Sequence, residues 1–175
     1  SIAYAIAEAF RREGANVILT YQGERLQRSL EDIGQALGAA KVFQCDVSKD
    51  EDLANLAATL APEFPKIDIV VHSIAFANSE DLSRPFVQTS RDGFKLALEV
   101  SAWSLVGVAN AVRPLMTDGG SIMTLTYLGA QRVLEAAFAT WTIAVMVAIS
   151  RLPNASGASR PAPGQKSSFC RGSLP

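Results

Sequence analysis

Few residues of this chain have types and spacing that could do chemistry, and the first group is acidic. Alternate polar positions are occupied by Asp46, Ser48, Asp50 and Asp52, somewhat as in a calcium-binding loop. Such a loop needs glycine and, at its last position, glutamate, where this sequence has Glu51 and Ala57. Calcium binding is therefore excluded. Two interpretations stay open: Ser48 or Asp50 caps the next helix, or Asp46 accepts a hydrogen bond from a nucleotide base.

Two further candidates stand at the ends of apolar runs. His72 is the only histidine, so neither a histidine-based metal site nor a Ser-His-Asp triad can be assembled. Its position predicts a buried histidine with satisfied hydrogen bonds, and no metal is expected. Tyr127 is a better candidate, because a phenol at a strand end faces the ligand crevice of an α/β sheet; a packing role is the open alternative.

The elements that position these residues follow from hydrophobic periodicity. Apolar runs predict strands at residues 17–21, 41–47, 67–76 and 121–127. Helical patterns precede or separate them: an opening helix ending at Gly14, a second ending at Gly38, a third over 53–60, and a long one over 89–116 with Ser90 as its N-cap. This alternation predicts a doubly wound parallel α/β sheet.

In that architecture ligands bind at the carboxyl ends of the strands. The expected rim is formed by 21–22, 46–47, 73–77 and 126–127. A helix at the first residue, with no strand before it, predicts that the central first strand and its glycine turn are missing. The apolar stretch 136–149 is too short to span a bilayer and predicts a buried helix. The alternative is that Trp141 to Ile149 supplies a substitute strand in the central gap.

Composition narrows the class of protein. Sixteen basic side chains nearly balance seventeen acidic ones, which argues against nucleic acid or an anionic membrane as partner. No secretory leader is visible, and the two cysteines, Cys45 and Cys170, lack metal-ligand spacing. A cytoplasmic location and a buried, inert Cys45 thiol are expected. Residues 1–152 are predicted to form an incomplete dinucleotide-binding domain, and the Pro/Gly/Ser-rich residues 153–175 a disordered tail.

Five segments, in order, resemble one family. They are SIAYAIAEAFRREGA, LTYQGERL, QCDV, VHSIAFA and LTYLGAQRV. Together they resemble the bacterial NADH-dependent enoyl-acyl-carrier-protein reductases, a divergent branch of the short-chain dehydrogenase/reductases, from Ser1 to about Leu134. The resemblance implies a Rossmann-like fold, NADH as cofactor, a homotetramer, and reduction of a trans-2-enoyl thioester on acyl carrier protein in type II fatty acid synthesis.

By this resemblance, Ser1 and Ile2 end the glycine-rich loop that lies against the cofactor pyrophosphate. Gln22 takes the position that faces the adenosine ribose, where a neutral residue without a nearby cation suits NADH better than NADPH. The remaining cofactor contacts implied are Asp46 and Val47 at the adenine, and Ser73, Ile74 and Ala75 at the strand end beside the ribose. Many relatives have glycine in place of Ala75.

The resemblance makes Tyr127 the first of two active-site tyrosines. The family places the second tyrosine, which stabilises the enolate, and a lysine, which binds the nicotinamide ribose, at positions that hold Ala137 and Ala144 here. No tyrosine follows Tyr127, and the only later lysine is Lys166. A deletion after Leu134 with a shifted reading frame is one explanation.

The chain is therefore predicted not to reduce the enoyl thioester unaided. The alternative is a non-catalytic member of that family, which either binds a nucleotide or serves only in assembly. An ordinary short-chain dehydrogenase acting on alcohols or ketones is a weaker alternative, because the Tyr-Leu-Gly motif and the absent Tyr-x3-Lys argue against it.

Overall fold

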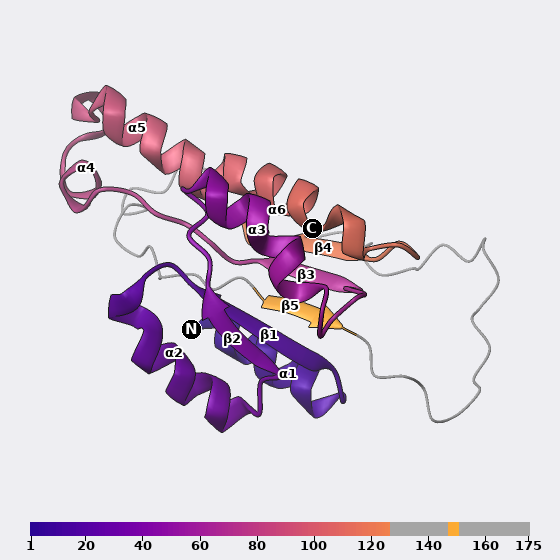
Figure 1. Cartoon of the computed structure of the whole chain (residues 1–175). Helices are drawn as coiled ribbons and strands as arrows, with labels where there is room; N and C mark the ends of the chain where they lie inside the picture. Colours follow the sequence, from indigo (N-terminus) through magenta and orange to yellow (C-terminus); the bar gives the residue numbers. More distant parts are fainter. Residues whose placement is uncertain (127–146, 151–175) are drawn as a thin grey trace, which may run out of the picture.

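The computed structural model describes residues 1–126 and 147–150, and its centre is a five-stranded sheet (Figure 1). The strands follow the order β2-β1-β5-β3-β4 across the sheet. Their bounds are β1 Asn16–Tyr21, β2 Lys41–Gln44, β3 Ile69–His72, β4 Ser121–Thr124 and β5 Val147–Ser150. Predicted strands thus exist where expected, but β2, β3 and β4 end several residues earlier than the apolar runs.

Helices fill the connections between the strands. They are α1 Ile2–Arg12, α2 Glu24–Leu37, α3 Asp50–Leu60 and the short α4 Ser79–Ser83, with a 3₁₀ turn at Phe86–Gln88. The long helix expected near 89–116 is a continuous run of four parts: α5 Arg91–Leu98, a π-helical turn Glu99–Trp103, α6 Ser104–Val112 and a 3₁₀ turn Arg113–Leu115. The predicted glycine ends are confirmed, since Gly14 and Gly38 take positive φ angles of 85° and 63°.

The central strand corrects two predictions. β1 pairs with β2 and β3 pairs with β4 in parallel, but β5 lies between β1 and β3 and is antiparallel to both. The sheet is therefore mixed, and a helix at 147–149 is wrong. The substitute strand is confirmed for Val147–Ile149, whereas 141–146 lie outside the described residues. The physical reason is that β1 and β3 each offer a row of backbone groups that an extended segment satisfies on both sides.

The two faces of the sheet carry two separate cores. On one face Ile18 and Val70 pack with Leu56 of α3 and Val108 of α6. On the other, Val17, Leu19 and Val71 pack with Ala7 of α1 and with partly buried residues of α2. Figure 1 shows this layering, with α3 and α6 on one side and α1 and α2 on the other. Alternate strand residues thus face opposite layers, as doubly wound folds require.

By length and composition alone, the helical run Arg91–Leu115 could cross a membrane. Core helices pass the same test, and this run contributes Val100, Val108 and Val112 to the core. Only 22% of the apolar window is buried, and Phe94, Leu98, Trp103 and Val106 are exposed, so packing in the core accounts for only part of the apolar character. One such helix is weak evidence for a membrane.

Candidate functional site

The carboxyl ends of β1 and β2 form a cavity of about 420 Å³. It is lined by Gln22, Gly23, Glu24, Arg25, Leu26, Gln44, Asp46 and Lys49. Parallel strands end at the same edge of a sheet, so the loops after β1 and β2 meet there. The structure therefore brings together Gln22 and Asp46, two of the residues that the sequence singled out. We call this space the first cavity.

Asp46 is held in place by the chain that follows it. Its Oδ1 accepts hydrogen bonds from the backbone amide of Ser48 at 3.0 Å and from the Ser48 hydroxyl at 2.7 Å. Its own amide donates to Asp52 Oδ2 at 2.7 Å. Within the described residues no hydrogen bond uses the other oxygen of Asp46, Oδ2. This buried carboxyl group, 8% exposed, thus keeps one acceptor available at the first cavity.

The same contacts correct the capping prediction. The N-cap of α3 is Lys49, which makes no side-chain capping bond, and Asp50 is already the first helical residue. Ser48 precedes the N-cap residue, and its hydroxyl donates to Asp46 Oδ1. The acidic residues Asp50, Glu51 and Asp52 in the first turn are favoured by the helix dipole instead.

Two cations line the same cavity as Gln22. They are Arg25 and Lys49, so two cations share the cavity in which the resemblance implies a neutral residue without a nearby cation. Neither cation forms an ion pair with any residue in 1–126 or 147–150. Arg25 was missed because a single basic residue on an exposed helical turn gives no periodic signal. The carboxyl group of Glu24 lies on the same wall, so the cavity carries both signs of charge.

The end of β3 carries the histidine. His72 is 1% exposed, with Nε2 2.7 Å from the hydroxyl of Ser104 and Nδ1 3.4 Å from that of Thr124. The Ser104 hydroxyl donates to the carbonyl of Val100 at 2.6 Å, so its oxygen accepts the hydrogen bond from His72 Nε2–H. Burial lowers the pKa of His72 and outweighs a backbone hydrogen bond that raises it. The predicted buried, satisfied histidine is confirmed.

The three residues after His72 pass from the core toward the surface. Ser73 is buried, and Ile74 and Ala75 are half-buried. The loop that follows lines a second cavity of about 720 Å³. Its lining residues are Arg25, Phe76, Ala77, Asn78, Ser79, Glu80, Asp81, Arg84 and Ser90. Arg25 lines both cavities, so the two are neighbours along the carboxyl edge of the sheet.

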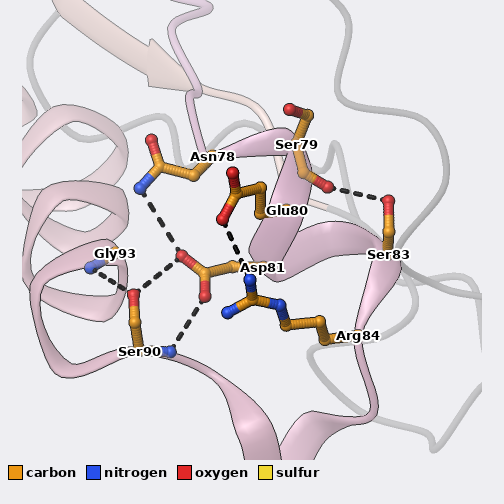
Figure 2. A network of polar contacts seen from close by, with 8 residues as sticks. All are labelled: Asn78, Ser79, Glu80, Asp81, Ser83, Arg84, Ser90 and Gly93. Carbon is orange, nitrogen blue, oxygen red and sulfur yellow. Dashed lines mark hydrogen bonds and ion pairs between the residues drawn. The ribbon is translucent and has the colours of Figure 1, made fainter.

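A polar network ties this loop to the start of α5 (Figure 2). Ser90 is the N-cap, as predicted, and its hydroxyl accepts from the amide of Gly93 at 3.0 Å. Asp81 accepts from the amide and hydroxyl of Ser90 at 2.9 and 3.0 Å. Arg84 pairs with Glu80 one helical turn away, at 3.0 Å. Sequence reasoning missed Asp81, since nothing in the pattern links it to a serine nine positions later.

Other predicted site residues are not brought to the first cavity. Ser1 and Ile2 are exposed at the start of α1, where Ser1 Oγ accepts from the amide of Tyr4 at 3.3 Å, and they line neither cavity. Val47 is 6% exposed and packs in the core. Tyr127, Ala137 and Ala144 lie outside the described residues.

Metal chemistry finds no support in the part of the chain that the structure describes, where no group of three or more His, Cys, Asp and Glu could hold an ion. Cys45 is buried and free. Its burial, followed by the charges of Asp52 and Asp46, raises the pKa of the thiol to about 12. The prediction that the Cys45 thiol is buried is therefore confirmed, and its inertness stays a prediction.

Comparisons with known proteins agree on one family. A family model described as "Enoyl-(Acyl carrier protein) reductase" matches residues 1–148. An enoyl-(acyl-carrier-protein) reductase (NADH) of Bacillus cereus is 47% identical over 137 residues, which are 77% of this chain and 54% of that protein. The chain thus spans about half the length of the curated relatives it matches.

Solved structures give the same result. The enoyl-(acyl-carrier-protein) reductase (NADH) of Aquifex aeolicus has a TM-score of 0.75 at 42% identity, covering 78% of this chain and 54% of that one. The reductase of Anaplasma phagocytophilum, solved in complex with NAD, has a TM-score of 0.73 at 38% identity, covering 77% and 51%. The described fold therefore corresponds to about half of these proteins.

Proposed function

Because the chain belongs to the enoyl-(acyl-carrier-protein) reductase family, we propose that it binds the adenosine half of NADH in the first cavity. The observation that carries this proposal is the meeting of Gln22 and Asp46 at one cavity on the carboxyl edge of the sheet. Dinucleotides bind at this edge in doubly wound folds. In the relatives' lineage the bound cofactor supplies a hydride to an enoyl thioester carried by acyl carrier protein.

The residues present fit an adenosine group. The volume of the first cavity, about 420 Å³, lies in the range of roughly 300 to 1,000 Å³ typical of small-molecule sites. Oδ2 of Asp46 offers an acceptor for the amino group of the base. The Gln22 amide both donates and accepts, as paired ribose hydroxyls require. Ser73, Ile74 and Ala75 line neither cavity, so their contact with the ribose is proposed from the family resemblance alone. The same holds for the adenine contact of Val47 and for the approach of Ser1 and Ile2 to the pyrophosphate.

Catalysis is a separate part of the proposal. We assign Tyr127 to the site as the family's first active-site tyrosine. Since Ala137 and Ala144 stand where the family has its second tyrosine and its lysine, the chain lacks the hydroxyl that stabilises the enolate and the ammonium that holds the nicotinamide ribose. Losses of several powers of ten are typical when cooperating catalytic groups are removed. Enoyl reduction by this chain alone is therefore expected to be very slow.

The second candidate is a non-catalytic role within the same family, favoured by the same two alanines. In that case the chain binds nucleotide, or joins an assembly with a full-length reductase, without turning over substrate. The free thiol of Cys45 is consistent with the cytoplasmic location proposed for either role. The homotetramer expected from the resemblance stays a prediction, which co-purification with a full-length relative and size-exclusion chromatography would test.

Isothermal titration of the whole chain with NADH, together with an assay on a trans-2-enoyl thioester, tests the proposal. We expect binding, weakened by Gln22→Ala, with little or no turnover. Gln27→Ala is the matched control, because Gln27 is exposed on α2 and its amide donates to Glu31 at 2.8 Å. Turnover as fast as that of a full-length reductase would refute the catalytic part. Failure of NADH to bind would refute the whole proposal.

A further inference from the structure

The long helical run contacts the end of β3 and the segment after it from two residues, Ser101 in the π-helical turn Glu99–Trp103 and Ser104 just after that turn. The first contact is that of Ser104, which follows the turn: its hydroxyl donates to the carbonyl of Val100 at 2.6 Å and accepts from Nε2 of His72 at 2.7 Å. A serine that bonds to the carbonyl four residues earlier competes with regular helical bonding and bends a helix. The buried Ser104 hydroxyl thus lies directly after the widened turn and against the last residue of β3.

The second contact lies within the turn. The hydroxyl of Ser101 accepts from the backbone amide of Phe76 at 3.1 Å and lies 3.3 Å from the carbonyl oxygen of Phe76, to which it donates. One side chain thus engages both backbone groups of a single residue. Π-helical turns frequently occur at functional sites, where the cost of the widened turn is offset by contacts of this kind.

These contacts fix the two ends of a short segment. Ser73, Ile74 and Ala75 lie between His72, bonded by Ser104, and Phe76, bonded by Ser101. The ends differ in what else holds them: His72 and Ser73 are 1% and 4% exposed, whereas the Phe76 side chain is 44% exposed. Packing suffices to hold the first end. At the second end the backbone of Phe76 is held by the two hydrogen bonds of the Ser101 hydroxyl.

We propose that Ser101 is a positioning residue for nucleotide binding, which holds the backbone of Ser73–Ala75 in the conformation that meets the cofactor. This inference rests on the proposed function, since it takes that segment as a cofactor contact. Ser101 touches no ligand itself. It acts by removing the freedom of the chain at Phe76, so that the bound conformation exists before the nucleotide arrives and costs no ordering entropy on binding.

The test compares Ser101→Ala, Ser101→Thr and the unmodified chain by isothermal titration with NADH, and follows amide hydrogen exchange at Phe76 without nucleotide. Loss of one hydrogen-bonded hydroxyl should weaken NADH binding about three- to tenfold and speed exchange at Phe76. Ser101→Thr keeps the hydroxyl and should restore both. Ser83→Ala is the matched control, because that exposed hydroxyl donates at 2.8 Å to Ser79 within α4 and lines neither cavity.

The NADH titrations of the Ser101 variants distinguish a positioning role from a merely structural one. Weaker binding in Ser101→Ala, restored in Ser101→Thr and absent in Ser83→Ala, supports the positioning role. Affinity in Ser101→Ala within twofold of the unmodified chain overturns it, even if the melting temperature falls, because a merely structural bond would change stability and not affinity. If the unmodified chain binds no NADH, the proposed function is overturned and this inference with it.

Discussion

Asp81 accepts two hydrogen bonds from Ser90, one from its backbone amide at 2.9 Å and one from its hydroxyl at 3.0 Å (Figure 2). These bonds, the one from the amide above all, lower the pKa of Asp81. Through them the loop after β3 is attached to the N-cap of α5. The close approach is possible because residue 93 is glycine: a Cβ at that position would overlap Oδ2 of Asp81 and crowd the Ser90 hydroxyl.

We expect Gly93→Ala to destabilise the protein. In a helix interior the same change usually adds about 0.5 to 1 kcal/mol of stability. Here the methyl group must displace Asp81, so the free energy of unfolding should fall by about 1 to 3 kcal/mol, as in other overpacked sites. Urea denaturation followed by circular dichroism measures it. In an Asp81→Ala background the loss should be smaller, because only the close contact with the Ser90 hydroxyl remains. Equal effects in both backgrounds would contradict the explanation.

His72 predicts a pH dependence of stability. Its pKa is lowered in the folded state, so the unfolded chain takes up a proton at higher pH than the folded chain does. Near pH 7 and above, both states are neutral at this residue and the effect is absent. As the pH falls below the ordinary histidine value of about 6.5, the unfolded state binds more protons and the free energy of unfolding falls.

The check is a series of urea titrations between pH 7.5 and 5.5 on the unmodified chain and on His72→Gln. The glutamine amide keeps polar groups near Ser104 and Thr124 but does not titrate in this range. We expect stability to fall with pH in the unmodified chain and much less in the variant. Parallel curves for both proteins would show that other groups cause the loss.

The sequence was sufficient to predict which segments are strands and helices, because the residues of each face repeat with the period of the element. Val17, Ile18 and Leu19 are all buried, as a strand covered on both sides requires. Strand ends were not predictable. The apolar run continues past His72, but the chain leaves the sheet there, since the Ser101 hydroxyl binds Phe76 from a helix far along the sequence.

The direction of the central strand could not be predicted either. The sequence of a short apolar segment such as Val147–Ser150 does not say whether it pairs parallel or antiparallel to its neighbours. In the folded chain it pairs antiparallel to both β1 and β3. At the site, strand order was enough to bring Gln22 and Asp46 together. The contributions of Arg25, Lys49 and Asp81 depend on loop conformation, for which their spacing gives no periodic signal.

Cys45 should resist modification by thiol reagents in the folded protein. Its pKa is raised to about 12 by burial and by the charges of Asp52 and Asp46, and the thiolate is the reactive form. In a Cys170→Ser variant, which leaves Cys45 as the only cysteine, we expect almost no reaction with Ellman's reagent at pH 8 until urea unfolds the chain. Rapid reaction under native conditions would show that the thiol is accessible.

The cations of the first cavity predict how the chain discriminates between NADH and NADPH. The extra phosphate of NADPH sits on the adenosine ribose, and basic residues after the strand are what accommodate it in this kind of fold. Arg25 and Lys49 line the first cavity and form no ion pair within 1–126 or 147–150, and Gln22 places no negative charge beside the ribose. The negative charge of Glu24, on the same wall, opposes the phosphate. The balance between this charge and those of Arg25 and Lys49 therefore decides whether NADH or NADPH binds more tightly.

We expect NADPH to bind with an affinity close to that of NADH. Arg25→Gln should weaken the binding of NADPH roughly five- to tenfold and change the binding of NADH less than about twofold, which is the size expected when one solvent-exposed, charge-assisted hydrogen bond to the phosphate is lost. Glu24→Gln should strengthen the binding of NADPH, because it removes the negative charge that opposes the phosphate. Arg28→Gln is the matched control, since Arg28 is an exposed residue of the same helix that lines neither cavity. Titration at low and high salt measures the effect, because screening by salt should erase it. If Arg25→Gln changes both cofactors equally, its charge does not face the ribose phosphate, and the neutral Gln22 alone sets the preference for NADH.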